Sequence, residues 1–367
     1  MSGGTEGGFW ADRRLLRVED LYVSFRTGGE SVAAVRGLTF AVGSEEIVGI
    51  AGESGSGKTV SALAIIGLLS KRTASVRGAA LLNGRDLLSL SERDRRRVRG
   101  REIGLVYQDP LVALNPLRTI GSQLLEAVKA HSSASRAANK ERVLELLAMV
   151  SLQQPRRVAH QYPHQLSGGM RQRVLIAIGI ASRPTLLIAD EPTTALDVSV
   201  QAHILDLLLK LQAQHRMSVI LISHDLGLLA QTTDRLVVMY GGEVVEAGPS
   251  SSVTRSPEHP YTAGLLGARP SSTSTPRTRL AQIPGQPLDL NQMSHLAGCV
   301  FAPRCALATP HCREERPSLR LRSSNHFAAC WETEGERVRA EHLTQLSGSP
   351  VRSASSHRYG DLDERVT

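Results

Sequence analysis

The chain has 367 residues, of which 41% are apolar and 21% charged, so its composition is that of a soluble globular protein with room for two or three domains. No run reaches the ~18 consecutive apolar residues of a membrane span, and the first ten residues lack the basic and apolar regions of a signal peptide, so we expect a cytosolic protein that can lie against a membrane protein. The net charge is +8, but its densest cluster, Arg93 to Arg101, lacks the interleaved aromatic residues that base stacking requires, which argues against nucleic acid as a partner.

The apolar residues predict two blocks in which strands and helices alternate. The first block contains strands near 15–25, 38–42 and 46–51, and a helix from about 58 to 69. A helical region follows from about 109 to 183. The second block contains a buried strand at 185–189, an amphipathic helix at 198–215, a strand at 218–223 and a hairpin at 236–247.

Composition also suggests how the chain divides into domains. Past Pro249 it becomes rich in Pro, Ser, Thr and Arg, and all four cysteines lie between 299 and 330. We therefore expect a flexible N-terminus over 1–13, a main domain over 14–255, a C-terminal region over 256–332 and a disordered tail over 333–367. The stretch 271–278 is expected to be a poorly ordered connection.

The loop that follows the strand at 46–51 has the form G-x4-G-K-T, which is a phosphate-binding loop. Its glycines permit backbone angles that aim successive N–H groups at phosphate oxygens, and the helix that follows adds its positive N-terminus. Lys58 is expected to bridge the β- and γ-phosphates, and the Thr59 hydroxyl to ligate Mg²⁺. The predicted nucleotide-binding residues of this loop are Gly52, Ser54, Gly55, Ser56, Gly57, Lys58 and Thr59.

A second element places two acids after a buried strand. Leu186 to Ala189 are apolar, and a strand buried on both faces delivers the next residues, Asp190 and Glu191, to the edge of the sheet where ligands collect. We expect Asp190 to hold the Mg²⁺ shell and Glu191 to polarise the attacking water. Paired acids after a strand can also cap a helix, but the phosphate-binding loop upstream favours the catalytic interpretation.

The stretch Leu166-Ser167-Gly168-Gly169-Met170 is similar to the signature of the ATP-binding cassette (ABC) family, and this resemblance covers residues 14 to about 250. It implies a P-loop NTPase (RecA-like) α/β fold with an antiparallel β subdomain and a helical subdomain over about 109–183 that carries the signature. In that family Ser167, Gly168 and Gly169 face the nucleotide of an opposite subunit, so that two ATP molecules lie between two ATPases. Met170 replaces the more common Gln, with little expected loss because Ser167 and the backbone contact the phosphate.

Four further positions follow from the same resemblance. Gln108 resembles the Q-loop glutamine, which is a metal ligand and the joint to the helical subdomain, and Asp197 belongs to a stretch that is similar to the D-loop. His224 resembles the switch histidine that senses the γ-phosphate. Phe25 occupies the position of the aromatic residue that stacks on adenine, with Tyr22 as a weaker alternative. Glu191, His224 and Gln108 are thus the predicted catalytic residues.

A finer resemblance, extending to about residue 332, is to the ATPases of oligopeptide and dipeptide importers. It is carried by Tyr162 to Gln165, by the stretch from Ala189 to Asp197 and by His259-Pro260-Tyr261. The resemblance implies an ATPase at the cytoplasmic face of the cell membrane, with two permease subunits, a second and non-identical ATPase, and an extracytoplasmic peptide-binding protein as partners. The segment 109–125 is expected to contact the membrane subunits.

Alternatives to peptide transport remain open. The cargo can instead be nickel, an opine or glutathione. An alternative from another class is a soluble ABC ATPase that acts on nucleic acid or ribosomes.

The cysteines form the pattern C-x5-C-x6-C-x17-C, which is no standard zinc or ferredoxin spacing. All four lie within 32 residues, which favours a shared ligand over a disulfide in a cytosolic protein. The resemblance implies a small Cys-containing C-terminal extension with a [4Fe–4S] cluster on Cys299, Cys305, Cys312 and Cys330. Zinc and unliganded thiols remain alternatives.

Overall fold

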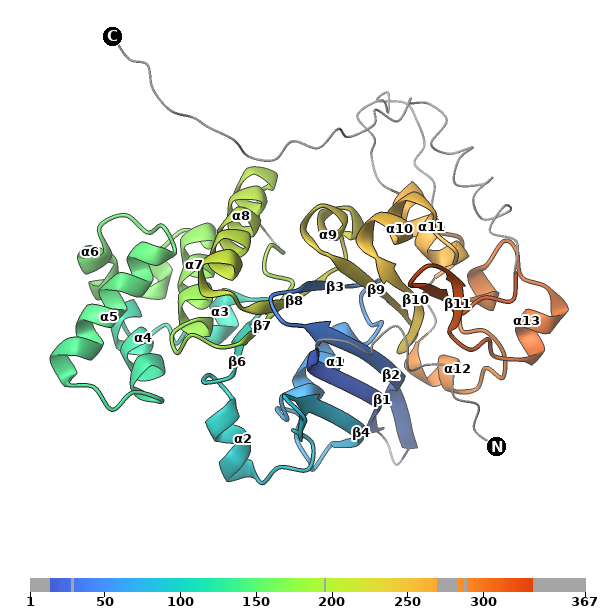
Figure 1. The fold of residues 1–367 in the computed structure, drawn as a ribbon, viewed down its shortest axis with the longest axis horizontal. Coiled ribbons are helices and arrows are strands. Elements are labelled where there is room, and N and C mark those ends of the chain that lie inside the picture. The colour runs from blue at the N-terminus through green and yellow to red at the C-terminus, as the bar shows by residue number, and fades with distance from the viewer. Residues whose placement is uncertain (1–13, 28–29, 195, 269–282, 287–288, 333–367) are drawn as a thin grey trace, which may run out of the picture.

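The protein is represented by a computed structural model, which describes residues 14–27, 30–194, 196–268, 283–286 and 289–332. Figure 1 shows a central sheet flanked by a second sheet, a helical part at one end and the C-terminal region at the other. The expectations for 1–13, 271–278 and 333–367 lie outside the described residues.

The central sheet has eight strands in the order β11-β12-β10-β9-β3-β8-β7-β6. Its parallel strands are β6 (Ile103–Val106), β7 (Leu186–Asp190), β8 (Ser218–Ser223), β3 (Ile47–Ala51) and β9 (Arg235–Tyr240). Every residue of β3, β7 and β8 is buried, as expected for apolar strands that are covered on both faces. The predicted buried strands and the α/β fold are thereby confirmed.

Helices on this sheet include α1 (Lys58–Ile65), α8 (Val198–His215), α9 (Leu226–Thr232) and α10 (Ser250–Arg255). The bounds of α8 agree with the prediction, and its inward residues Ile204, Leu207, Leu208 and Leu211 are buried. Helix α1 ends earlier than predicted. The N–H of Gly67 bonds to the carbonyl of Ala64, that of Leu68 bonds to the carbonyl of Leu63, and Gly67 has φ +66°. This is the Schellman arrangement by which a glycine ends a helix.

The second sheet is antiparallel, in the order β2-β1-β4-β5. It consists of β1 (Arg14–Thr27), β2 (Glu30–Gly43), β4 (Ala74–Leu82) and β5 (Arg85–Asp86), and α2 (Glu92–Val98) follows it. Sequence analysis found parts of β1 and β2 but not β4. The reason is that β4 buries only Ala80 and Leu82 and exposes or half-exposes its other residues, so it carries little apolar signal.

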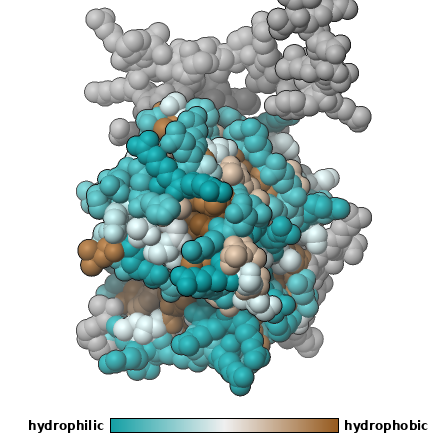
Figure 2. Space-filling view, turned by 90° about the vertical axis from the view of Figure 1, so that its left-hand side faces the viewer, coloured by the Kyte–Doolittle hydropathy of each residue, from teal (hydrophilic) through white to brown (hydrophobic). Residues whose placement is uncertain are grey.

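The helical part lies at the left of Figure 1 and is inserted along the chain between the neighbouring strands β6 and β7. Its elements are α3 (Pro110–Ala113), α4 (Ile120–Lys129), α5 (Arg136–Met149), α6 (Pro155–His160), a 3₁₀ turn η1 (Pro163–Gln165) and α7 (Gly168–Gly179). Serine or threonine caps start three of these helices, with Thr119, Ser135 and Ser167 each accepting a backbone N–H. Figure 2 views this end of the molecule and shows a mainly hydrophilic surface on which a few hydrophobic residues appear.

The C-terminal region is joined to the central sheet rather than attached by a loose linker. Its elements are α11 (Pro260–Gly267), α12 (Leu290–Ser294), η2 (Ala302–Arg304), α13 (Pro310–Glu314), β11 (Arg320–Ser323) and β12 (His326–Ala328). The neighbouring strand of the central sheet is β10 (Glu243–Pro249). Strand β12 pairs with β10. Glu246 of β10 is fully buried, accepts the N–H groups of Glu258 and His259, and contacts the His326 imidazole at 2.7 Å. Among the described residues no helix is long and apolar enough to span a membrane.

Candidate active site

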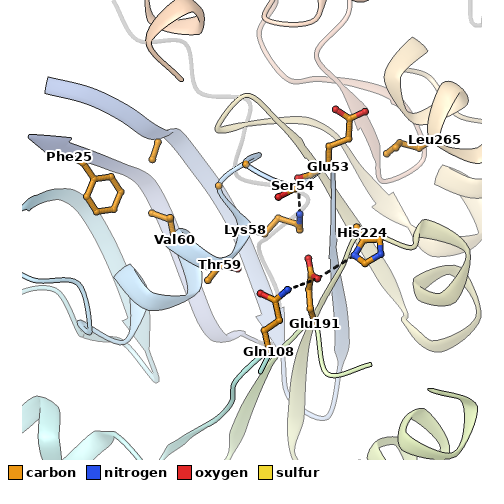
Figure 3. A pocket seen from close by; sticks show the side chains of 13 residues that line it. Phe25, Glu53, Ser54, Lys58, Thr59, Val60, Gln108, Glu191, His224 and Leu265 are labelled. Carbon is orange, nitrogen blue, oxygen red and sulfur yellow. Dashed lines mark hydrogen bonds and ion pairs between the residues drawn. The ribbon is translucent and has the colours of Figure 1, made fainter. Parts of the chain in front are cut away.

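A cavity of about 670 Å³ opens where β3 runs into the glycine-rich loop, which is within the size range of small-molecule sites. Figure 3 shows Lys58, Gln108, Glu191 and His224 pointing toward one another, with Phe25 at the other end of the cavity. The lining also includes the predicted loop residues Ser54, Gly55, Gly57 and Thr59. The structure therefore brings motifs that are far apart in the sequence, from Ser54 to His224, to one cavity.

Backbone geometry explains two of the loop glycines. Gly52 has φ +152°, and a Cβ at this position would lie 2.3 Å from the carbonyl oxygen of Met239. Gly57 has φ +97°, and its Cβ would lie 2.7 Å from the carbonyl oxygen of Ala34. Only glycine is free of both conflicts at each position. The loop can thus turn tightly against β9 and β2 and present its N–H groups and the start of α1 to an anion.

The Lys58 side chain is buried within the phosphate-binding loop and bonds to its backbone. Its ammonium group donates to the carbonyl oxygens of Gly52 at 2.7 Å and Glu53 at 2.9 Å, and it lies 3.5 Å from the Ser56 hydroxyl. Only 4% of the residue is exposed. Burial lowers the pKa of Lys58, and nearby carboxylates oppose that shift. A buried cation at a helix N-terminus is an environment suited to a polyphosphate.

Oxygen ligands for a hard cation meet beside the lysine. The Thr59 hydroxyl donates to Asp190 Oδ1 at 3.0 Å, and Gln108 lines the same cavity. Burial raises the pKa of Asp190, so a cation beside it would favour the ionised form. One carboxylate, one hydroxyl and one amide oxygen suit Mg²⁺, which usually takes the rest of its shell from water and substrate phosphates. The residues present therefore fit the predicted metal.

Glu191 is the point at which the polar groups converge. Its Oε2 accepts from Gln108 Nε2 at 3.1 Å and lies 3.3 Å from His224 Nδ1 (Figure 3). The same oxygen of Glu191 also accepts from the Thr194 hydroxyl at 2.8 Å. Its backbone has φ +44°, which is uncommon for a residue with a side chain. Strain of this kind gathers at functional sites because the surrounding structure must enforce it. Here the N–H of Glu191 bonds to the carbonyl of Ile222 at 3.0 Å.

The aromatic residue expected to contact the base is present at the far end of the cavity. Phe25, on β1, lines the cavity and is partly buried. Tyr22 does not line it, and its ring instead lies 5.6 Å below the Arg77 guanidinium. The position of these two side chains favours Phe25 over Tyr22 as the base-stacking residue.

The signature residues lie outside this cavity. Ser167 is exposed and caps α7 by accepting the N–H of Met170 at 3.3 Å. A Cβ on Gly168 would lie 3.2 Å from Leu196, and one on Gly169 would lie 2.7 Å from Val200, so the signature packs against the start of α8. Asp197 caps α8 through Val200 N–H at 2.9 Å and is exposed, and backbone hydrogen bonding lowers its pKa. Ala195, also in the predicted D-loop, is outside the described residues.

Sequence analysis missed three contacts at the site. Thr194 bonds to Glu191, and Leu265 of α11 lines the cavity. Glu53 forms hydrogen bonds with Tyr261 and Arg304 of the C-terminal region. Thr194 belongs to the stretch from Ala189 to Asp197 that carries the family resemblance, but the sequence does not predict its bond to Glu191. Nothing in the sequence relates Leu265 or Arg304 to the loop, because more than 200 residues separate them.

The four cysteines also meet, at a cavity separate from the nucleotide cavity. Cys299, Cys305, Cys312 and Cys330 line one cavity of about 10 Å³, which is the room that a single water molecule needs. Burial raises the pKa of Cys305 to about 12 and that of Cys330 to about 11. Within the described residues, no group of three or more His, Cys, Asp or Glu side chains is arranged to hold a metal ion. Thiols are suitable ligands for a metal ion or an iron–sulfur cluster, but in the described structure these four are not arranged as a metal site.

Known proteins share these motifs and this fold. Residues 35–194 match the family model described as "ABC transporter", and residues 245–312 match "Oligopeptide/dipeptide transporter, C-terminal region". A probable peptide ABC transporter ATP-binding protein of Sinorhizobium fredii is 46% identical over 87% of this chain and 95% of its own length. This chain belongs to the ABC transporter ATPase family. The dipeptide transport ATP-binding protein DppD of Escherichia coli is 43% identical over 86% of the chain and 96% of its own length.

Two further matches agree with this family. The oligopeptide transport ATP-binding protein OppD of Mycobacterium tuberculosis is 47% identical over 87% of this chain, which spans only 52% of that relative. A solved dimer of the ATP-binding cassette MJ0796 with ADP and Pi matches with a TM-score of 0.58 at 28% identity, over 64% of this chain and 98% of that one. The ABC fold is thereby confirmed, and ATP is the nucleotide of this family.

Proposed function

We propose that this chain is the ATP-hydrolysing subunit of an ABC importer that powers the uptake of dipeptides or oligopeptides across the cytoplasmic membrane. The observation that carries the proposal is that Lys58, Thr59 and Glu191 line one cavity, with Asp190 bonded to Thr59, in a chain whose C-terminal region is of the oligopeptide/dipeptide type. Cells that lack the chain should fail to take up a radiolabelled dipeptide. A copy with Lys58→Ala should not restore uptake, whereas the unaltered copy should.

The residues have distinct proposed roles in hydrolysis. The loop N–H groups and Lys58 bind the phosphates, Phe25 stacks on the base, and Mg²⁺ would be held by Thr59, Asp190 and Gln108. Bound Mg²⁺ neutralises charge on the β- and γ-phosphates. Glu191 orients and polarises the attacking water, while His224, which lies beside that carboxylate, senses the γ-phosphate. These assignments rest on the geometry of the cavity and on the ABC family.

A second ATPase completes the site in this proposal. Ser167, Gly168, Gly169 and Asp197 lie outside the chain's own cavity, at exposed helix starts that can bind the nucleotide of a partner. Support comes from the similar cassette MJ0796, whose solved structure is a dimer. We propose a non-identical partner ATPase, two permease subunits, and a peripheral position at the cytoplasmic face of the membrane.

The proposed contact with the permeases is the segment 109–125. Val112 on α3 and Leu117 after it are each 85% exposed, and Leu111 is 62% exposed. Apolar groups this open to water on adjoining turns are typical of an interaction surface. The variant Val112→Asp/Leu117→Asp should lose co-purification with the permeases while its affinity for ATP stays at the wild-type value. Leu321→Asp, which alters another exposed leucine, is the matched control and should keep both.

We also propose that Cys299, Cys305, Cys312 and Cys330 hold a [4Fe–4S] cluster. The support is that all four cysteines of the chain line one cavity, although this cavity must widen to admit the cluster. Protein purified without oxygen should contain about four iron and four sulfide per chain. Cys305→Ser should lose both. Stoichiometric zinc, or no metal in protein purified in this way, contradicts the cluster.

Cargo other than peptides would leave the site unchanged. Nickel, opines and glutathione are distinguished by competition: an excess of each should not reduce uptake of the labelled dipeptide if peptides are the cargo. A soluble ABC ATPase that acts on nucleic acid or ribosomes would instead co-purify with RNA or DNA and without permeases.

A further inference from the structure

One residue of the phosphate-binding loop is held by the C-terminal region. The Glu53 carboxylate accepts two hydrogen bonds from the Arg304 guanidinium, from Nη1 at 2.7 Å and from Nη2 at 3.3 Å. The backbone N–H of Glu53 donates to the Tyr261 hydroxyl at 2.8 Å. Its carbonyl oxygen accepts from Lys58 at 2.9 Å. All three polar groups of Glu53 are therefore engaged, two of them by residues more than 200 positions away.

The groups that hold Glu53 are themselves rigidly placed. The Arg304 side chain is 5% exposed, donates through Nε to the carbonyl of Pro284 at 2.9 Å, and lies 5.8 Å from the centre of the Tyr240 ring. Tyr261 is fully buried and packs against Tyr240 and Phe301, with ring centres 4.7 and 5.3 Å away. A guanidinium fork and a phenol fixed in this way lose little freedom when they bind the loop.

Because Glu53 is an acid, its contact with Arg304 affects how the loop binds a polyphosphate. A carboxylate within a loop that binds a polyphosphate repels that ligand unless a cation lies beside it. Arg304 supplies this cation from a position that is almost fully buried, where salt screens the pair weakly. The Tyr261 contact meanwhile fixes the backbone whose carbonyl holds Lys58.

We propose that Arg304 and Tyr261 are positioning residues of the nucleotide site, so that the C-terminal region forms part of the ATP-binding machinery as well as an extension of the fold. Arg304 neutralises Glu53, and Tyr261 holds the loop in the shape that receives the phosphates. Neither side chain lines the cavity, so both act through Glu53. This inference rests on the proposed ATPase function.

The test is the dissociation constant of Mg-ATP, measured by calorimetry, together with the melting temperature of the protein without nucleotide. Arg304→Gln should bind Mg-ATP about tenfold or more weakly, because the Glu53 charge is left beside the phosphates. Glu53→Gln/Arg304→Gln should bind more tightly than Arg304→Gln alone, because the uncompensated charge is gone. Tyr261→Phe, which keeps the aromatic packing, should bind about threefold more weakly.

A control separates positioning from general anchoring. Arg316 also joins the C-terminal region to the sheet, through Glu243 at 2.6 Å, but does not contact the loop. Arg316→Gln should lower the melting temperature and leave the affinity for Mg-ATP within twofold of wild type. The inference is overturned if Arg304→Gln binds like wild type, if the double variant shows no recovery, or if Arg316→Gln weakens binding equally. A wild-type chain that binds no nucleotide would instead refute the proposed ATPase function, and the inference with it.

Discussion

Glu191→Gln is expected to bind Mg-ATP as tightly as wild type and to hydrolyse it at least about 100-fold more slowly. The amide keeps the shape of the side chain but is not a base. In the structure the carboxylate is 11% exposed and bonded to Gln108 and Thr194, so it has one orientation toward the cavity. Release of phosphate from ATP measures the rate, and calorimetry measures the affinity.

The outcome separates two roles for Glu191. If the residue only capped its neighbours, the variant would lose stability while its folded fraction hydrolysed ATP at the ordinary rate. Glu141→Gln, an exposed acid on α5, is the control and should change neither quantity. Ordinary turnover by Glu191→Gln would remove this residue from the role of base. If the variant accumulates as a stable dimer with ATP bound, then hydrolysis, rather than ATP binding, is the step that lets the two ATPases separate.

The parts of the site that sequence analysis found are those in which a short pattern fixes local geometry. A buried strand followed by G-x4-G-K-T permits one arrangement of strand, loop and helix, and the structure has it from β3 to α1. In the same way β7 delivers Asp190 and Glu191, and β8 ends at Ser223 just before His224. Parallel strands end at the same edge of a sheet, so these acids and the histidine meet there.

What sequence analysis missed depends on pairing between distant segments. Strand β4 has little apolar signal, and β12 is three residues long and gains its place only by pairing with β10. The contact of Arg304 with Glu53 spans 251 positions and leaves no trace in local periodicity. The cysteines were expected to share a ligand from their grouping, and they do line one cavity. Their spacing gave no information on the narrowness of that cavity.

The expected result for Ser167→Arg is a chain that still binds ATP in its own loop, while hydrolysis falls at least about 100-fold at the site that Ser167 completes. Ser167 is exposed and does not line the cavity, so its own loop should be unaffected. The long cationic side chain would block the helix start that a partner's nucleotide approaches. Ser135→Arg is the matched control, since Ser135 is likewise an exposed cap, of α5, and lies outside the signature.

Mixing two inactive variants tests whether a site is shared between chains. Lys58→Ala cannot hold nucleotide but has an intact signature, whereas Ser167→Arg has the reverse defect. If the chain pairs with itself, an equal mixture should recover about a quarter of wild-type hydrolysis, because half of the dimers are mixed and each has one complete site of two. If mixed dimers form, as cross-linking of tagged chains would show, and no activity returns, Ser167 does not act on the opposite nucleotide. If neither variant pairs with itself, the same complementation applies to the partner ATPase: Ser167→Arg in this chain should then silence the partner's site and leave its own.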